Sequence, residues 1–206
     1  MKNYAEFIFC ESPHVIPKQN NDNENETCEN EEKKLSEPII QEEKGWWFSR
    51  SDKSYNACEI TDCDTGFNDT LDFINIVFQK QGPFDGIFSF SQGASLGSIL
   101  SQISFSNNER FNFIRFKFAI LVAGFKSGQK QHDIFYNLEN KINIPTLHLI
   151  GNGDKVIPSD MSLTLTNYFV NPKIHMHEGG HFIPVNAESK IAYIDFLNEM
   201  NKIVFE

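Results

Sequence analysis

Residues 84–100 read FDGIFSFSQGASLGSIL, and this stretch decides the fold class. It opens with an apolar segment, 84–90, that is typical of a buried strand. It passes through Ser91-Gln92-Gly93 and ends in a run of small and apolar residues that predicts a helix to about residue 103. A strand that turns directly into a helix is the repeating unit of α/β proteins. We therefore predict an α/β fold.

The same alternation continues on both sides of this stretch. Before it, the apolar residues Phe67, Leu71, Ile74 and Phe78 recur at helical spacing and predict a helix. Gly82-Pro83 would end this helix. After it, we predict strands at 116–122, 146–150 and 173–177 and a closing helix at 187–202. Strands that alternate with helices predict a mainly parallel sheet with helices on both faces. Near the N-terminus, residues 6–10 (EFIFC) predict one more buried strand.

Length and composition indicate one domain with an insertion. The 206 residues suit a single domain, 1–206, with a sizeable core. Residues 19–44 hold nine acidic side chains and three lysines and have few apolar ones. Such a segment cannot bury enough apolar surface to offset its ordering entropy. We predict a disordered acidic insertion there, with an acidic interaction tail as the alternative.

The charge balance and the cysteines restrict the partners and the compartment. Eighteen basic against 28 acidic side chains give a net charge of -10, which disfavours nucleic acid and anionic membrane surfaces as partners. No apolar run approaches the roughly 20 residues of a membrane span, and Glu6 interrupts the short apolar N-terminal segment, so we expect no signal peptide. The four cysteines form no CxxC pair (Cys10, Cys28, Cys58, Cys63). We expect reduced thiols and a cytoplasmic protein.

Ser91 is the candidate nucleophile. The sequence Ser89-Phe90-Ser91-Gln92-Gly93 resembles G-x-S-x-G, with a serine at the first glycine position. That pattern places a serine on a tight turn between a strand and a helix, where small neighbours are needed. The alternative is an ordinary helix start that is capped by serine.

A serine nucleophile needs a base and an orienting acid, and the later sequence offers both. Asp154 follows the strand at 146–150, and His181 lies between the last strand and the last helix. In an open parallel sheet, both would lie at the edge where Ser91 lies. The order Ser91, Asp154, His181 is that of the α/β-hydrolases. Alternatively, Asp154 only caps a turn and His181 is a structural loop histidine.

Two other groups of residues admit a binding role. His175 and His177 alternate on one predicted strand, but no third metal ligand is evident, so we expect no metal. Residues 45–49 (GWWFS) form a dense aromatic patch, which we interpret as core or loop packing rather than a ligand cage.

Six segments together resemble the FSH family of serine hydrolases: FDGIFSFSQGASLGSIL, KFAILVAGFKSG, IPTLHLIGNGDKVIP, HEGGHFIPVN and, as in its animal branch, AEFIFCESPHVIP and KGWWFS. The resemblance implies a three-layer α/β-hydrolase fold and a carboxylesterase, with acyl-chain esters as substrates of some members. It assigns Ser91 as nucleophile, Asp154 as acid and His181 as base. It implies a small-molecule ester as partner, no cofactor, and the nucleus as a second compartment. The oligomeric state stays open.

The resemblance also implies a difference. Family members begin with another strand and a His-Gly type turn, whereas Met1 lies just before what resembles their second strand. That strand would be interior to the sheet, between residues 6–10 and 84–90, so we expect an N-terminally incomplete fold. Its loop would supply one oxyanion donor, which leaves the backbone N–H of Gln92. The missing strand and the serine at position 89 motivate one alternative, a catalytically impaired acyl-binding or interaction protein. A thioesterase is a further alternative, because it would use the same three residues.

Overall fold

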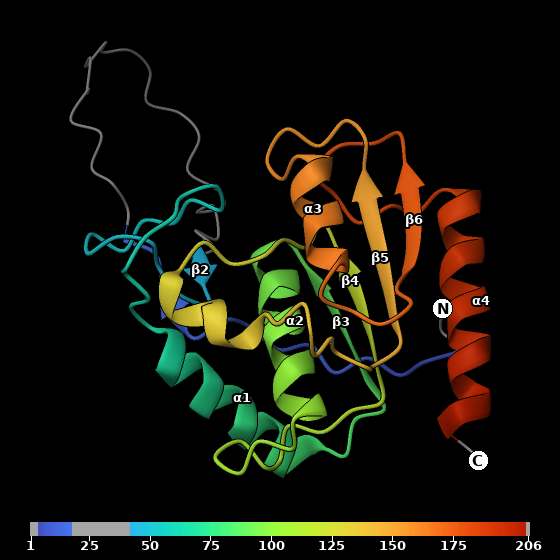
Figure 1. The fold of residues 1–206 in the computed structure, drawn as a ribbon, viewed down its shortest axis with the longest axis horizontal. Helices are drawn as coiled ribbons and strands as arrows, with labels where there is room; N and C mark the ends of the chain where they lie inside the picture. The colour runs from blue at the N-terminus through green and yellow to red at the C-terminus, as the bar shows by residue number, and fades with distance from the viewer. Residues whose placement is uncertain (1–3, 18–41, 205–206) are drawn as a thin grey trace, which may run out of the picture.

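A four-stranded parallel sheet forms the centre of the molecule. The computed structural model describes residues 4–17 and 42–204. The strand order is β3-β4-β5-β6 (Figure 1), and the strands are β3 Gly86–Phe90, β4 Phe118–Val122, β5 Thr146–Gly151 and β6 Lys173–His177. Strands β3, β4 and β6 lie within their predicted segments, and β5 extends one residue beyond its segment. Because all the pairs are parallel, the C-terminal ends of β3, β5 and β6 lie at the same edge of the sheet.

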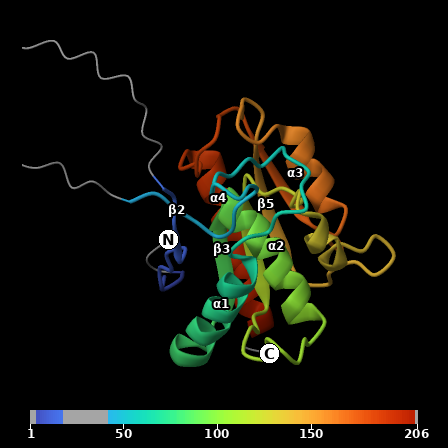
Figure 2. The same ribbon diagram turned by 90° about the vertical axis from the view of Figure 1, so that its left-hand side faces the viewer.

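Helices cover both faces of this sheet, which confirms the predicted α/β-hydrolase-like fold. The helices are α1 Phe67–Gln81, α2 Gln92–Phe105, α3 Ser159–Thr166 and α4 Ala187–Val204, with a short 3-10 helix, η1, at Lys130–Phe135. Side chains of α1, α2 and α3 share one core cluster, whereas α4 packs on the opposite face (Figure 2). Helix α1 ends where the Gly82 N–H bonds to the carbonyl of Phe78, at the predicted stop.

The continuous apolar run of β4 is explained by burial on both faces. Ala119 and Leu121 belong to the core under α1 and α2. Ile120 and Val122 belong to the second core, against Tyr193 and neighbouring residues of α4. A strand covered on both sides needs apolar residues at every position, because successive side chains point to opposite faces.

The prediction of a buried strand at residues 6–10 is wrong. This segment has no strand conformation, and no backbone hydrogen bond is found for it within the described part of the chain. Phe9 is 91% exposed and Ile8 is 53% exposed. An apolar segment becomes a strand only when another strand pairs with it. Here a cavity lies between residues 6–10 and β3, and the Phe7 ring reaches across it to pack edge-on against Phe88, with 6.1 Å between centroids.

Most of the predicted acidic insertion, and Cys28 with it, lies outside the described residues. Its last three residues, 42–44, are described: Lys44 begins β2, Lys44–Gly45, which pairs antiparallel with β1, His14–Val15. The Ile16 N–H also bonds to the carbonyl of Glu43, 2.8 Å away. The insertion as predicted therefore extends too far at its C-terminal end.

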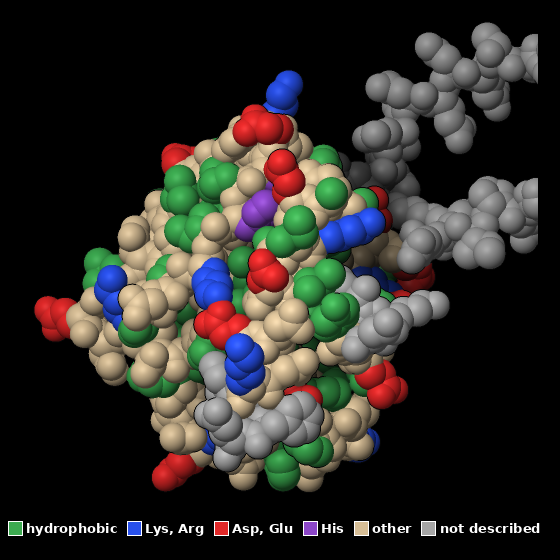
Figure 3. Space-filling model, turned by 90° about the vertical axis from the view of Figure 1, so that its right-hand side faces the viewer, with side chains coloured by type: hydrophobic (Ala, Val, Ile, Leu, Met, Phe, Trp, Pro, Cys, Tyr) green, Lys and Arg blue, Asp and Glu red, His purple; other side chains and the backbone are tan. Residues whose placement is uncertain are grey.

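The surface over α4 carries mixed charge. Basic and acidic side chains are interspersed over this face, some of them directly beside each other, with apolar side chains between them (Figure 3). In the described part of the chain, no helix combines the length and the apolar character that crossing a bilayer requires.

Candidate active site

Ser91 occupies a strained turn between β3 and α2. Its φ of 55° and ψ of -125° are unusual for any residue other than glycine. Its N–H bonds to the Val122 carbonyl at 2.9 Å, which ties the turn to β4. Its own carbonyl accepts the N–H groups of Ala94 and Ser95, which begins α2. The backbone is thus fixed on both sides, and the hydroxyl is held at the sheet edge.

His181 contacts Ser91 from the loop after β6. Its Nε2 lies 2.9 Å from the Ser91 Oγ, and its Nδ1 lies 2.8 Å from Oδ2 of Asp154. The imidazole also packs against the ring of Phe90, with 4.8 Å between centroids. With the proton on Nδ1, Nε2 is free to accept the hydroxyl proton of Ser91.

Asp154 both caps a turn and binds the histidine. Its Oδ1 accepts the N–H groups of Val156 and Ile157, each at 2.8 Å, while Oδ2 faces His181. The carboxylate is therefore almost fully enclosed, with the residue 8% exposed. The two interpretations that the sequence left open for Asp154 both describe what it contacts, one for each oxygen.

The two loops that carry Asp154 and His181 are bonded to each other. The Asn152 N–H bonds to the His177 carbonyl at 2.8 Å, and the Gly153 N–H to the Gly179 carbonyl at 3.0 Å. Gly151 lets them approach this closely, because a Cβ at that position would lie 2.7 Å from the carbonyl oxygen of Gly179. The acid and the histidine are thus aligned by backbone contacts of their loops.

Backbone donors lie beside the Ser91 hydroxyl. Helix α2 begins at Gln92, so the first-turn N–H groups of Gln92 and Gly93 have no acceptor within the helix. The N-terminus of a helix favours negative charge because its N–H groups and its dipole point outward. Negative charge that forms on an atom bonded to the Ser91 Oγ would lie next to these donors.

The Gln92 side chain has a role that the sequence analysis missed. Its Oε1 accepts the backbone N–H of Trp46 at 2.9 Å, and its Nε2 donates to the backbone carbonyl of Trp47 at 2.8 Å. Both hydrogen bonds hold the 45–48 segment against the turn that carries Ser91. The only signal in the sequence was a polar residue directly after the serine, and 45 residues separate it from its partner Trp47.

The aromatic patch at 45–49 divides into two parts. Trp47 is fully buried and packs edge-on against Phe67, which agrees with the packing interpretation. Trp46 is only partly buried, and its indole lies near Gly93, where a Cβ would come within 3.4 Å of its Nε1. Trp46 therefore lies beside the first turn of α2, two residues after Ser91.

His175 and His177 bond to protein groups. His175 Nε2 lies 2.8 Å from the Ser189 hydroxyl, and His177 Nδ1 accepts the Gly179 N–H at 3.2 Å. Burial, with a smaller contribution from the charge of His175, lowers the pKa of His177. No group of three or more candidate metal ligands occurs among residues 4–17 and 42–204.

The arrangement of Ser91, His181 and Asp154 suits nucleophilic attack on a carbonyl carbon. A hydroxyl, an imidazole and a buried carboxylate follow one another within hydrogen-bonding distance. The N–H groups at the start of α2 directly follow Ser91 in the chain, and donors of this kind stabilise a tetrahedral oxyanion. The residues come from three loops at one sheet edge, as expected from their order in the sequence.

Comparisons with known proteins agree on the family. A family model described as "Serine hydrolase (FSH1)" matches residues 1–193. Esterase OVCA2 of Xenopus tropicalis is 43% identical over 159 residues, which are 77% of this chain and 67% of that protein. Esterase OVCA2 of Danio rerio is 35% identical over 200 residues, covering 96% of this chain and 85% of that protein.

Other relatives are longer, and solved structures share the fold. Esterase GA18864 of Drosophila pseudoobscura pseudoobscura is 33% identical over 196 residues, which are 95% of this chain but 61% of that protein. The chain thus spans 61–85% of the length of these three relatives. Among solved structures, acyl-protein thioesterase 2 of Zea mays matches with a TM-score of 0.53 at 15% identity, covering 77% of this chain and 73% of that one.

Proposed function

The chain belongs to the FSH1 family of serine hydrolases, as its sequence resemblance implied, and on this premise we propose that it cleaves carboxylic esters through Ser91. The observation that carries the proposal is the chain of contacts from the Ser91 Oγ through His181 to Asp154, at 2.9 Å and 2.8 Å. The three relatives compared above are named esterases, which supports the same reaction class.

In the proposed acylation step, Ser91 attacks the ester carbonyl. The Oγ–C bond forms while the hydroxyl proton passes to Nε2 of His181, and the carbonyl oxygen becomes an oxyanion. The Gln92 backbone N–H donates to that oxyanion, which stabilises it. Asp154 keeps the other imidazole proton on Nδ1 and stabilises the imidazolium. His181 then gives its proton to the departing alcohol, which leaves an acyl-enzyme.

Deacylation repeats these steps with water as the nucleophile. His181 accepts a proton from water, whose oxygen attacks the acyl carbon, and Ser91 leaves as the protonated hydroxyl. The same residues would serve a thioester, because only the leaving group differs. Hydrolysis of matched p-nitrophenyl and thiol esters with one acyl group would show which bond is preferred.

Covalent labelling tests the proposal directly. A fluorophosphonate probe should label the full chain, and labelling and short-chain ester hydrolysis should both disappear in Ser91→Ala. Ser98→Ala is the matched control: Ser98 is a buried serine of α2, the helix that begins directly after Ser91, and its replacement should leave labelling intact. Labelling that persists in Ser91→Ala would overturn the assignment.

One observation supports the second candidate, an acyl-binding or interaction protein with impaired catalysis. Strand β3, which ends directly before Ser91, has no neighbour on its outer side within the described chain, and a cavity lies there. A turn supported on one side only would be less rigid. A folded protein that binds a fatty acid but is never labelled by the fluorophosphonate would favour this candidate over the enzyme.

A further inference from the structure

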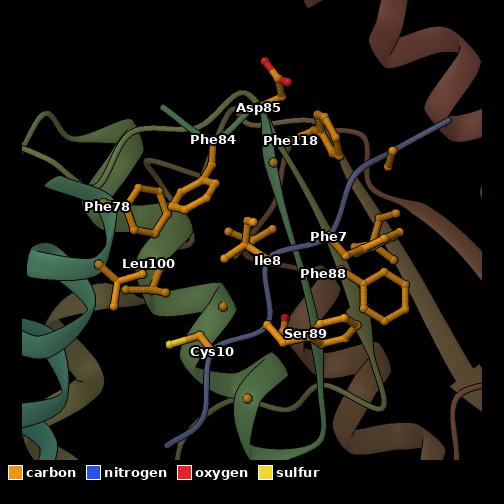
Figure 4. A pocket seen from close by; sticks show the side chains of 18 of the residues that line it. Phe7, Ile8, Cys10, Phe78, Phe84, Asp85, Phe88, Ser89, Leu100 and Phe118 are labelled. Atoms are coloured by element: carbon orange, nitrogen blue, oxygen red, sulfur yellow. The ribbon is translucent and has the colours of Figure 1, made fainter. Parts of the chain in front are cut away.

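A large cavity runs along the outer edge of β3. Its volume is about 900 Å³, and it lies between β3 and residues 4–10, which pass in front of the strand in Figure 4. Apolar side chains from both segments and from the helices line it, among them Phe7, Ile8, Phe84, Phe88, Leu100 and Phe118. We call it the β3 slot.

Backbone groups of β3 point into this slot. The Asp85 carbonyl accepts the Lys117 N–H at 2.8 Å, and the Ser91 N–H donates to the Val122 carbonyl at 2.9 Å, so both residues pair toward β4. In a parallel strand, the residues whose N–H and C=O face one side alternate with those that face the other. The N–H and C=O groups of Gly86, Phe88 and Phe90 therefore face the slot. No partner for them is found in the described part of the chain.

The slot is apolar on two sides, as a strand position inside a sheet would be. On the side of α1 and α2 it is lined by Phe78 and Leu100, and on the side of α4 by Leu197. Ser89 points toward α2, where its hydroxyl is buried without a partner among the described residues. Polar edges between two apolar walls match the needs of an extended polypeptide and of few other ligands.

We propose that the β3 slot binds an extended polypeptide strand of about five residues, apolar on both faces, which pairs with the outer edge of β3. Strand β3 has five residues, and a matching strand would span about 17 Å at 3.3–3.4 Å per residue. Such a strand would supply hydrogen bonds to Gly86, Phe88 and Phe90. It would also cover Phe7 and Ile8, which are partly exposed.

Other occupants fit less well. An acyl chain would fill the apolar space but leave six backbone groups of Gly86, Phe88 and Phe90 unpaired. A second copy of the chain could offer only its edge strands β3 and β6: residues 4–10 stand before β3 in each copy, and β6 (KIHMH) is not apolar on both faces. Residues 18–41 carry few apolar side chains and include Pro38, so their sequence does not provide a strand with two apolar faces.

A peptide with the sequence of β4 is a suitable probe, because β4 already pairs with the other edge of β3. We would use fluorescein-labelled KKFAILVAGKK, which contains residues 117–124 between added lysines. Binding to the full chain should raise the fluorescence anisotropy to saturation. Amide hydrogen exchange should slow by about tenfold or more at Gly86, Phe88 and Phe90, and much less at Ile87 and Ser89.

Matched controls separate strand pairing from apolar adhesion. The same peptide with its two residues from Ile120 and Leu121 replaced by proline stays apolar but loses backbone donors on both edges, and it should not bind. Ile8→Lys places a charge in the slot wall and should weaken binding about tenfold or more. Ile134→Lys changes an isoleucine of η1 that is 79% exposed and should bind like the parent chain.

Three results would overturn the proposal. The β4 peptide fails to bind the folded chain, or the proline peptide binds equally well. Alternatively, sedimentation shows a dimer in which Gly86, Phe88 and Phe90 are protected without peptide, which would assign the edge to a second copy. The readouts do not use ester hydrolysis, so the slot and the esterase proposal succeed or fail separately.

Discussion

The C-terminal end of β3 and its outer edge differ in how many hydrogen bonds hold them. At the C-terminal end, Ser91, His181 and Asp154 are held by backbone hydrogen bonds from three loops. Along the outer border, strand groups face a cavity of about 900 Å³. The candidate active site is thus held by its loops and by the pairing of β3 with β4, whereas no strand of the described chain supports β3 from its outer border.

The largest effect on ester hydrolysis is expected at Asp154, which lies at the C-terminal end of the sheet. In Asp154→Asn, Oδ1 still accepts from Val156 and Ile157, but an amide faces His181 in place of Oδ2 and favours the wrong tautomer. We expect ester hydrolysis to fall by about 10⁴-fold, with little change in melting temperature. Asp133→Asn, at an exposed aspartate paired with Lys126, is the control and should keep the parent rate.

A smaller effect should follow from moving the loops apart. The Cβ of Gly151→Ala would press on the carbonyls of Gly179 and Gly180, at 2.7 Å and 2.9 Å, and so displace His181. A misplacement of about 1 Å lowers a rate by about 10²-fold. Gly180→Ala would make only an ordinary contact at 3.5 Å and should retain most activity. Equal rates in the two variants would show that loop spacing does not align the site.

The free energy of unfolding should fall at acidic pH because two histidines are buried in the core. Burial lowers the pKa of His132 to about 4 and of His148 to about 3. An unfolded histidine titrates near 6.5, so below that pH the unfolded state binds more protons and stability falls as pH decreases. Each histidine should cost about 1.4 kcal/mol per pH unit between about pH 6 and its folded pKa. Urea unfolding of the parent chain and His132→Phe from about pH 7 to 5 should show a shallower loss in the variant.

The smallest rate effect concerns the link between the site and the aromatic segment. Gln92→Ala removes both hydrogen bonds to Trp46 and Trp47 but keeps the Gln92 backbone N–H. We expect a loss of about 1–3 kcal/mol in stability and less than about tenfold in ester hydrolysis. Gln102→Ala, in the last turns of the same helix, is the control for helix propensity. A loss of about 10²-fold or more would mean that the Trp46 segment takes part in substrate binding.

Helices α1, α2 and α4, the four parallel strands and the meeting of Ser91, Asp154 and His181 at one sheet edge could be predicted from the sequence, whereas helix α3 and the 3-10 helix η1 were not predicted. The patterns of the predicted elements are local, and the parallel order fixes which strand ends coincide. The state of residues 6–10 could not, because their apolar pattern does not reveal whether a partner strand lies beside them. Nor could the contacts of Gln92 with Trp46 and Trp47, since these depend on how two distant segments pack.

The left-handed backbone of Ser91 has a consequence for sequence drift and for engineering. At a φ of 55°, glycine would relieve strain worth about 1–3 kcal/mol, so Ser91→Gly should melt at a higher temperature than the parent chain. Any procedure that selects only for thermal stability would then favour the substitution that removes the proposed nucleophile. A serine retained in this conformation is therefore a marker of selection for chemistry rather than for folding.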